Sequence, residues 1–240
     1  MKPLRIPILM YHQVGKFNPL PWVTHGAKFC EVRAFRAQMR LLQQLGYEVI
    51  ALAEALRLLS GSQPVVSERP KVVLTFDDGF AGFAEYAWPI LREFHYSATV
   101  YVLSRMLNGE ATWLKKKETH ARLLDAQTIR RLHAEGVSFG SHGCTHRRLA
   151  ELSAEEQYQE IAQSRIELEQ IVGASIRDFC YPYGSFDETA LRHVREAGYT
   201  SAVTCEKRAA DPADSPYALP RIPIQYETTW FGFWRKLKYG

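Results

Sequence analysis

The alternation of short β-rich runs with longer stretches of helical period constrains the fold of this 240-residue chain most strongly. Runs such as 71–76 (KVVLTF) and 97–103 (SATVYVL) are apolar on both sides, whereas 31–47 has the apolar repeat of an amphipathic helix. Strands of that kind are typical of a parallel sheet covered by helices. Because about seven strand–helix units follow one another, we expect an α/β fold that forms a closed or nearly closed barrel.

The other expected elements repeat this pattern, and no Gly/Ser/Pro-rich linker divides them, so we expect one domain over 1–240. We expect further strands at 6–12, 136–142, 176–182, near 199–204 and near 219–224, and helices at 82–94, at about 125–135, 153–172 and 187–197.

Composition and charge exclude several classes of protein. The four cysteines lie far apart and form no CxxC pair, which argues against a disulfide scaffold and a structural zinc ribbon. The net charge of +4 is spread along the chain, so we expect no nucleic-acid partner. The N-terminal apolar run is too short for a signal peptide and no segment approaches a membrane span, so we expect a cytoplasmic protein.

The segment 226–240 stands apart because it combines aromatic and basic residues. Such a segment could contact the inner face of a membrane or a lipid-linked anionic substrate, as a peripheral protein does. The alternative is a final helix whose aromatic side chains pack on the domain while its lysines stay in water.

Polar side chains gather where the expected strands end. His12, Asp77, Asp78 and His142 each close an apolar run, and the segment 182–184 (PYG) follows another. In a parallel barrel the carboxyl ends of the strands lie on one face, where reactive groups sit. Asp77 and Asp78 repel each other and would be partly desolvated, which indicates a nearby positive charge.

A metal ion would explain this arrangement. His142 and His146 are four residues apart, so one turn of helix would bring both imidazoles to one side. With one aspartate they form a two-His, one-Asp set that leaves room for water and substrate, while the other aspartate serves as a general base. Taken singly, the same residues fit an ordinary surface pair, a plain turn at Gly79, and a core histidine at 12.

Several segments resemble the polysaccharide deacetylase family, the NodB-type carbohydrate esterases. TFDDG at 75–79 is similar to the first family motif, SHGCTH at 141–146 to the second, and YPYG at 181–184 to the third. Matches at ILMYH, ATVYV and LPRIPI are similar to the subgroup that deacetylates poly-N-acetylglucosamine. The resemblance extends over roughly residues 5–225 and implies a distorted (β/α)7 barrel.

The resemblance also implies roles for individual residues. Asp78, His142 and His146 would bind a divalent metal, most often zinc, with cobalt, nickel and manganese as alternatives. Asp77 would be the base, His12 the general acid, and the backbone N–H of Tyr183 a donor to the oxyanion.

The chain departs from the family pattern at two places. Many members have an arginine where this chain has Cys180, and we expect Arg221 to take over its task of orienting the base. The late histidine motif that supplies the acid elsewhere is not evident, and His12 would fill that gap. Trp113, Pro182 and Tyr183 are candidates for contacts with a sugar, although Trp113 fits a place in the core equally well.

We therefore expect a metal-dependent hydrolase that removes the N-acetyl group of an N-acetylhexosamine in a polysaccharide, oligosaccharide or lipid-linked glycan. The alternatives are hydrolysis of another non-peptide C–N bond, such as a ring amide or ureido compound, and a non-catalytic glycan-binding module. The sequence predicts neither the sugar and its linkage nor the oligomeric state.

Overall fold

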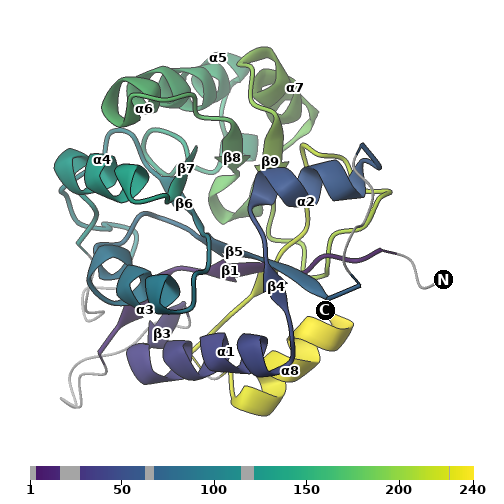
Figure 1. Ribbon diagram of the computed structural model, residues 1–240. Coiled ribbons are helices and arrows are strands. Elements are labelled where there is room, and N and C mark those ends of the chain that lie inside the picture. The colour runs from purple at the N-terminus through teal and green to yellow at the C-terminus, as the bar shows by residue number, and fades with distance from the viewer. Residues whose placement is uncertain (1–3, 17–27, 63–67, 115–121, 227) are drawn as a thin grey trace.

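A parallel sheet that curls into an incomplete barrel forms the centre of the molecule (Figure 1). The computed structural model describes residues 4–16, 28–62, 68–114, 122–226 and 228–240. In spatial order the strands are β10 (Ile222–Pro223), β1 (Ile8–Tyr11), β5 (Lys71–Phe76), β6 (Thr99–Val102), β7 (Ser138–Ser141), β8 (Asp178–Cys180) and β9 (Ser201–Val203). The expected α/β barrel class is confirmed.

The two ends of this sheet approach each other through the segment 219–223. Leu219 forms a parallel bridge with Val203 of β9, and Ile222 pairs with Leu9 of β1. The same short segment, which includes β10, therefore bridges β1 and β9. Two further strand pairs lie at the margins: β4 (Glu48–Val49) pairs with the start of β5, and β2 (Gln13–Gly15) pairs with β3 (Phe29–Glu31).

Helices cover the outside of the curled sheet (Figure 1). They are α1 (Val32–Gln44), α2 (Leu52–Leu59), α3 (Trp88–Glu93), α4 (Ala126–Ala134), α5 (Ala154–Tyr158), α6 (Ser164–Val172), α7 (Glu188–Glu196) and α8 (Trp230–Tyr239). Among the described residues, no helix is both long enough and apolar enough to cross a bilayer.

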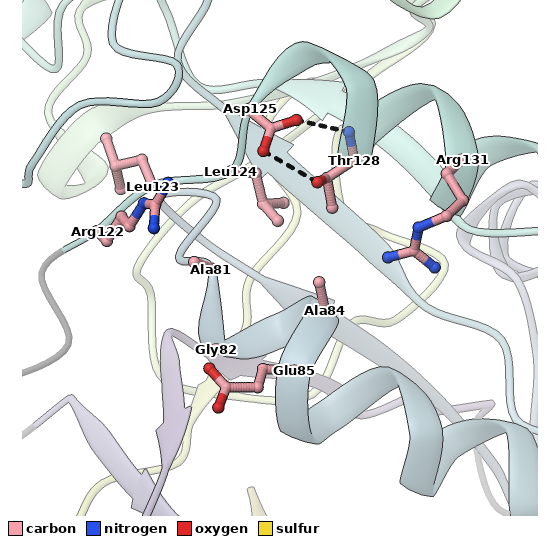
Figure 2. A pocket seen from close by; sticks show the side chains of 10 residues that line it. All are labelled: Ala81, Gly82, Ala84, Glu85, Arg122, Leu123, Leu124, Asp125, Thr128 and Arg131. Carbon is pink, nitrogen blue, oxygen red and sulfur yellow. Dashed lines mark hydrogen bonds between the residues drawn. The ribbon is translucent and has the colours of Figure 1, made fainter.

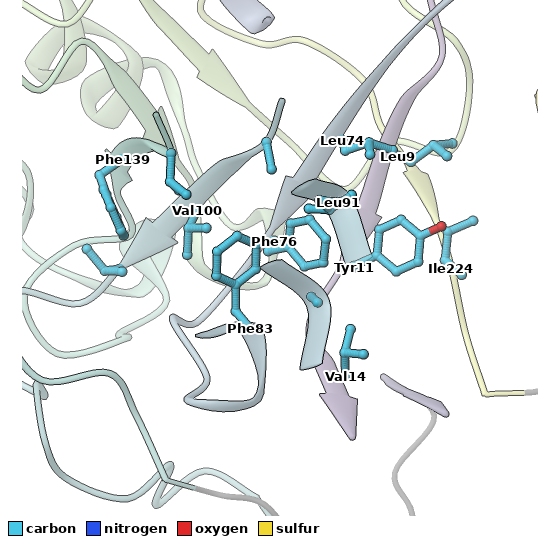
Figure 3. Packing of buried hydrophobic residues seen from close by; sticks show 14 of the residues in the cluster. Leu9, Tyr11, Val14, Leu74, Phe76, Phe83, Leu91, Val100, Phe139 and Ile224 are labelled. Atoms are coloured by element: carbon cyan, nitrogen blue, oxygen red, sulfur yellow. The ribbon is translucent and has the colours of Figure 1, made fainter. Parts of the chain in front are cut away.

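Alternation along the strands divides the core into an outer and an inner part. On the outer side Leu74 and Phe76 pack under the helices, where Phe76 stacks on Tyr11 at 5.2 Å and meets Phe83 edge-on (Figure 3). Val73, one residue out of phase, belongs to the smaller inner cluster. Since side chains alternate along a strand, residues 75 and 77 continue the inner side.

Two of the expected helices are less regular than the sequence suggests. The helix expected at 82–94 begins as a π-helical turn, η1 (Phe83–Ala87), and continues as α3. Pro89 lies in the first turn of α3, where a proline does not interrupt the helix. The helix expected at 153–172 contains a second π-helical turn, η3 (Gln159–Gln163), between α5 and α6. Such turns are frequent at functional sites.

Candidate metal and catalytic site

The chain turns sharply where β5 ends. The backbone N–H of Asp77 still donates to the carbonyl of Tyr11 at 2.9 Å, but Asp78 and Gly79 both adopt left-handed conformations with φ of 69°. A Cβ atom on Gly79 would lie 2.8 Å from Cγ1 of Val102, so only glycine fits. The turn therefore sends the two adjacent aspartates into different surroundings.

Asp78 faces the two histidines that follow β7. One carboxylate oxygen of Asp78 lies 3.2 Å from Nε2 of His142 and 3.3 Å from Nε2 of His146, and all three side chains are buried. The donor atoms of the three residues lie within 4.8 Å of one another. These residues could therefore hold a metal ion.

The surroundings of this triad fit a cation. Donors on a tetrahedron with bonds of about 2.0 Å lie about 3.3 Å apart, which matches both separations. Within the described part of the chain, neither oxygen of Asp78 has a hydrogen-bond partner, although both are buried. A buried carboxylate without donors is costly unless a positive charge joins it.

His142 is oriented by a second contact. Its Nδ1 lies 2.7 Å from the carbonyl oxygen of Cys180, which can only accept, so Nδ1 carries the proton and Nε2 presents its lone pair toward Asp78. A backbone carbonyl behind the imidazole is the usual arrangement for a histidine that binds a metal.

The loop that carries the histidines is not helical, which corrects the expectation of one helical turn. Gly143 and His146 have φ of 84° and 65°, and the segment 142–146 is irregular. Glu160 of η3 holds it instead: the buried carboxylate accepts the backbone N–H groups of Cys144 and Thr145, both at 2.9 Å, and the Thr145 hydroxyl. A carboxylate from a distant helix thus replaces the hydrogen bonds of a regular turn.

Asp77 has the opposite environment from Asp78. Arg221 is fully buried, and its guanidinium donates to both oxygens of Asp77, at 2.6 and 2.7 Å. Burial would raise the pKa of Asp77, but Arg221 outweighs it and lowers the pKa to about 2. Asp77 is therefore ionised and rigidly oriented.

Three further contacts fix the Arg221 side chain. It donates to the hydroxyl of Thr75 at 3.1 Å, to the carbonyl of Thr204 at 2.9 Å and to the sulfur of Cys180 at 3.1 Å. Many family members have an arginine at the position of Cys180. In this chain the guanidinium of Arg221 contacts the sulfur of Cys180 instead. No local pattern marks Thr75, Thr204 or Glu160 for these roles, because their contacts are all long-range.

His12 lies beside Asp77. Its Nε2 is 3.8 Å from the nearer oxygen of Asp77, and its Nδ1 is buried without a hydrogen-bond partner among the described residues. Burial and the positive charge of Lys28 lower the pKa of His12 to about 4. The imidazole is therefore neutral at pH 7 in the protein without metal or substrate.

A second set of ligand atoms overlaps with the first. Asp77, His142 and Cys180 also bring three donors within 4.8 Å. However, Arg221 contacts both Asp77 and Cys180, and its fixed positive charge opposes a cation there. Cys144, which lies between the two histidines in the sequence, points its sulfur toward the carbonyls of Gln159 and Glu160.

The aromatic candidates pack against the triad. The ring of His146 contacts two aromatic rings, with its centre 4.1 Å from that of Trp113 and 4.4 Å from that of Tyr183. Trp113 also packs on a small apolar cluster with Phe80, so it covers a triad histidine in addition to any contact with substrate. Tyr183, in the short turn η4 (Pro182–Gly184), has a φ of 59°.

Backbone strain concentrates at this site. Among the described residues, five other than glycine have positive φ, and three of them are Asp78, His146 and Tyr183. Left-handed backbone costs about 1–2 kcal/mol for residues with a side chain. Its clustering at one site is typical of positions where function sets the conformation.

A pocket of about 500 Å³ lies beside the site, between the start of η1 and the start of α4 (Figure 2). Gly82, Glu85, Arg122 and Thr128 are among its lining residues, and none of the triad is. Its charged groups are partly paired, since Asp125 caps α4 through Thr128 and Arg131 binds Glu135.

Comparisons with known proteins match this chain to one family. The family model described as polysaccharide deacetylase matches residues 65–202. The putative polysaccharide deacetylase YxkH of Bacillus subtilis (strain 168) is 27% identical over 223 residues, which cover 93% of this chain and 72% of that protein. Poly-beta-1,6-N-acetyl-D-glucosamine N-deacetylase of Escherichia coli (strain K12) is 25% identical, and the match covers 82% of this chain but 34% of that protein.

Solved structures share the fold. The Streptococcus pyogenes deacetylase PplD, in complex with acetate, superposes with a TM-score of 0.85 at 24% identity, covering 98% of this chain and 99% of that one. IcaB from Ammonifex degensii gives a TM-score of 0.80 at 20% identity, covering 98% and 96%. Since the family model spans more than half of the sequence and the fold agrees, the chain belongs to the polysaccharide deacetylase family.

Proposed function

We propose that this protein is a metal-dependent N-deacetylase that hydrolyses the N-acetyl group of an N-acetylhexosamine within a polysaccharide, an oligosaccharide or a lipid-linked glycan. One observation carries the proposal: two adjacent aspartates are separated into a buried carboxylate that faces two imidazoles and a second one held by an arginine. A glycan-binding module would need neither of these two carboxylate environments. Relatives named as poly-N-acetylglucosamine deacetylases support the choice of substrate class.

Asp78, His142 and His146 would hold the metal, most often zinc for two imidazoles and a carboxylate. When bound, a divalent cation supplies Lewis-acid polarisation of the acyl oxygen and a water of lowered pKa. Asp77 takes the proton of the attacking water, with its carboxylate fixed by Arg221. The backbone N–H of Tyr183 is the proposed donor to the oxyanion that develops on the acyl group.

The leaving amine needs a proton, and we assign its delivery to His12. Because the pKa of His12 is about 4, the imidazole does not hold that proton beforehand at neutral pH. We propose that His12 receives the proton that Asp77 removes from water and passes it to the amine, since Nε2 of His12 is 3.8 Å from Asp77. His12→Gln should then lower kcat while the bound metal stays. Unchanged turnover would remove His12 from the reaction.

Acetate release tests the function directly. The protein would be loaded with Zn²⁺, Co²⁺, Ni²⁺ or Mn²⁺ and offered N-acetylglucosamine oligomers and lipid-linked N-acetylhexosamines, with a chelator-treated sample as control. Release that depends on metal would support the proposal. Saturable glycan binding without acetate would indicate a binding module, and inactivity on every substrate with metal bound would favour another C–N bond.

A further inference from the structure

Helix α8 turns most of its aromatic side chains outward. Trp230, Phe231 and Tyr239 are 73%, 50% and 66% exposed, while Phe233 and Leu237 of the same helix are buried against the domain. Of the two alternatives for this segment, packing of the aromatic side chains on the domain therefore describes Phe233 but not these three exposed residues. Large apolar side chains with such exposure indicate an interaction surface when they are contiguous.

The outward rings do form a continuous row. Trp230 contacts Phe231 with ring centres 5.9 Å apart, Phe231 stacks on Trp234 at 5.7 Å, and Trp234 meets Tyr239 edge-on at 6.1 Å. We call these four residues the aromatic ridge. It runs the whole length of α8, from its first residue to its last.

The aromatic ridge carries uncompensated positive charge. Arg235, Lys236 and Lys238 lie on the same helix, and the segment 228–240 contains no acidic residue. In the described part of the chain none of the three forms an ion pair. The ammonium group of Lys238 instead lies 5.0 Å from the ring of Trp234 and 5.4 Å from that of Tyr239.

Rings and cations together identify the partner. Tryptophan and tyrosine favour the boundary between lipid tails and water, and lysine and arginine are attracted to anionic headgroups there. A neutral glycan would use the rings but not the exposed cations of Arg235 and Lys238. We propose that the aromatic ridge and its cations dock on a membrane surface that contains anionic lipids.

The position of α8 relates this surface to the site. Trp230 lines a groove of about 430 Å³ together with Gln38 of α1, and Gln38 accepts a hydrogen bond from Tyr11, the residue before His12. Tyr226, just before α8, contacts Phe29 of β3. The start of the aromatic ridge thus lies on the side of the barrel that carries His12. The docking proposal itself does not depend on the reaction.

Co-sedimentation of the full chain with lipid vesicles tests the proposal. We expect binding to vesicles that mix phosphatidylcholine with phosphatidylglycerol and little binding to phosphatidylcholine alone. Trp230→Ser/Phe231→Ser should weaken binding about tenfold or more, and Arg235→Gln/Lys238→Gln about fivefold for each charge removed. All four positions are exposed, so thermal unfolding should stay unchanged.

A matched control removes exposed apolar side chains elsewhere. Tyr158→Ser/Ile166→Ser changes residues that are 42% and 49% exposed on α5 and α6, and it should leave vesicle binding intact. Absence of binding to anionic vesicles, or equal loss in the control variant, would overturn the proposal. If sedimentation velocity instead shows a dimer that Trp230→Ser/Phe231→Ser dissociates, the surface belongs to a second copy of the chain.

Discussion

The turn that ends β5 and the loop that follows β7 supply the residues of the same proposed metal triad, but different forces hold them. At the end of β5 the strand ladder continues through Asp77, and Gly79 makes the turn in a space where no other residue fits. The loop at 142–146 has no such local support and depends on Glu160, which comes from η3. The first half of the site is therefore built locally, and the second half is built by a tertiary contact.

This difference has a physical basis in the two backbones. A parallel strand fixes both the direction and the alternation of its side chains, so one glycine suffices to redirect the chain. An irregular loop leaves its N–H groups unsatisfied, and a buried group without a partner is costly. Glu160 removes that cost and fixes the loop in the same step.

The largest effect is expected at Asp77. Asp77→Asn keeps the shape of the β5 turn but removes the proposed base, so turnover should fall by about 10² to 10⁴. Metal content should stay at the wild-type level, because Asp78 and both histidines are untouched. Acetate release and elemental analysis measure the two quantities. Loss of metal together with activity would show that the aspartates are not divided between two tasks.

Gly79→Ala tests whether the β5 turn is built locally. Left-handed backbone and the contact with Val102 should together cost about 2–4 kcal/mol of unfolding free energy. Gly46→Ala is the matched control, since Gly46 has a similar φ of 73° and open space around it, and should cost about 1–2 kcal/mol. Denaturant unfolding measures both. If both variants lost the same unfolding free energy, the contact of the new methyl group with Val102 would not contribute to the cost.

Glu160→Ala tests whether the β7 loop depends on its remote carboxylate. Metal affinity should fall about 10- to 100-fold. The backbone N–H groups of Cys144 and Thr145 would lose their acceptor, and the loop would no longer hold the two histidines in position. Glu160→Gln should restore much of the affinity, since its amide oxygen can accept both N–H groups. Titration with a competing chelator reports the affinity. Unchanged affinity in the alanine variant would contradict the comparison.

The smallest effect concerns pH and the metal-free protein. The pKa of Asp77 falls from an ordinary value of 3.8 to about 2 on folding, so its contribution to stability is present above about pH 4 and is lost as pH falls toward 2. Between pH 5 and pH 3 the wild type should lose about 1 kcal/mol more stability than Asp77→Asn. Denaturant unfolding at each pH measures this difference. If the unfolding free energies of both proteins fell equally between pH 5 and pH 3, Arg221 would not hold Asp77 ionised.

The part of the molecule that could be predicted from sequence is the part governed by local period. The strands at 71–76 and 97–103 and the helix at 31–47 have strong apolar repeats and appear close to where we expected them. Strand ends then placed Asp77, Asp78 and His142 on one face, because parallel strands share a direction.

What could not be predicted rests on contacts between distant residues. Spacing alone suggested a helical turn for His142 and His146, and nothing in the sequence marks Glu160 as the acceptor that makes an irregular loop stable instead. The π-helical turns η1 and η3 within two expected helices do not change the apolar repeat of the sequence either, so they could not be predicted from it. Arg221 could be proposed only from the family resemblance, since 144 residues separate it from Asp77.

That separation has a consequence for the order in which the protein is made. The chain can form β5, β7 and Glu160 well before the ribosome reaches Arg221, so the triad can assemble while Asp77 still lacks its guanidinium. A buried carboxylate without that partner would be protonated more readily. The ionised form of Asp77, which a base needs, is therefore secured last during synthesis, when the segment 219–223 docks between β9 and β1.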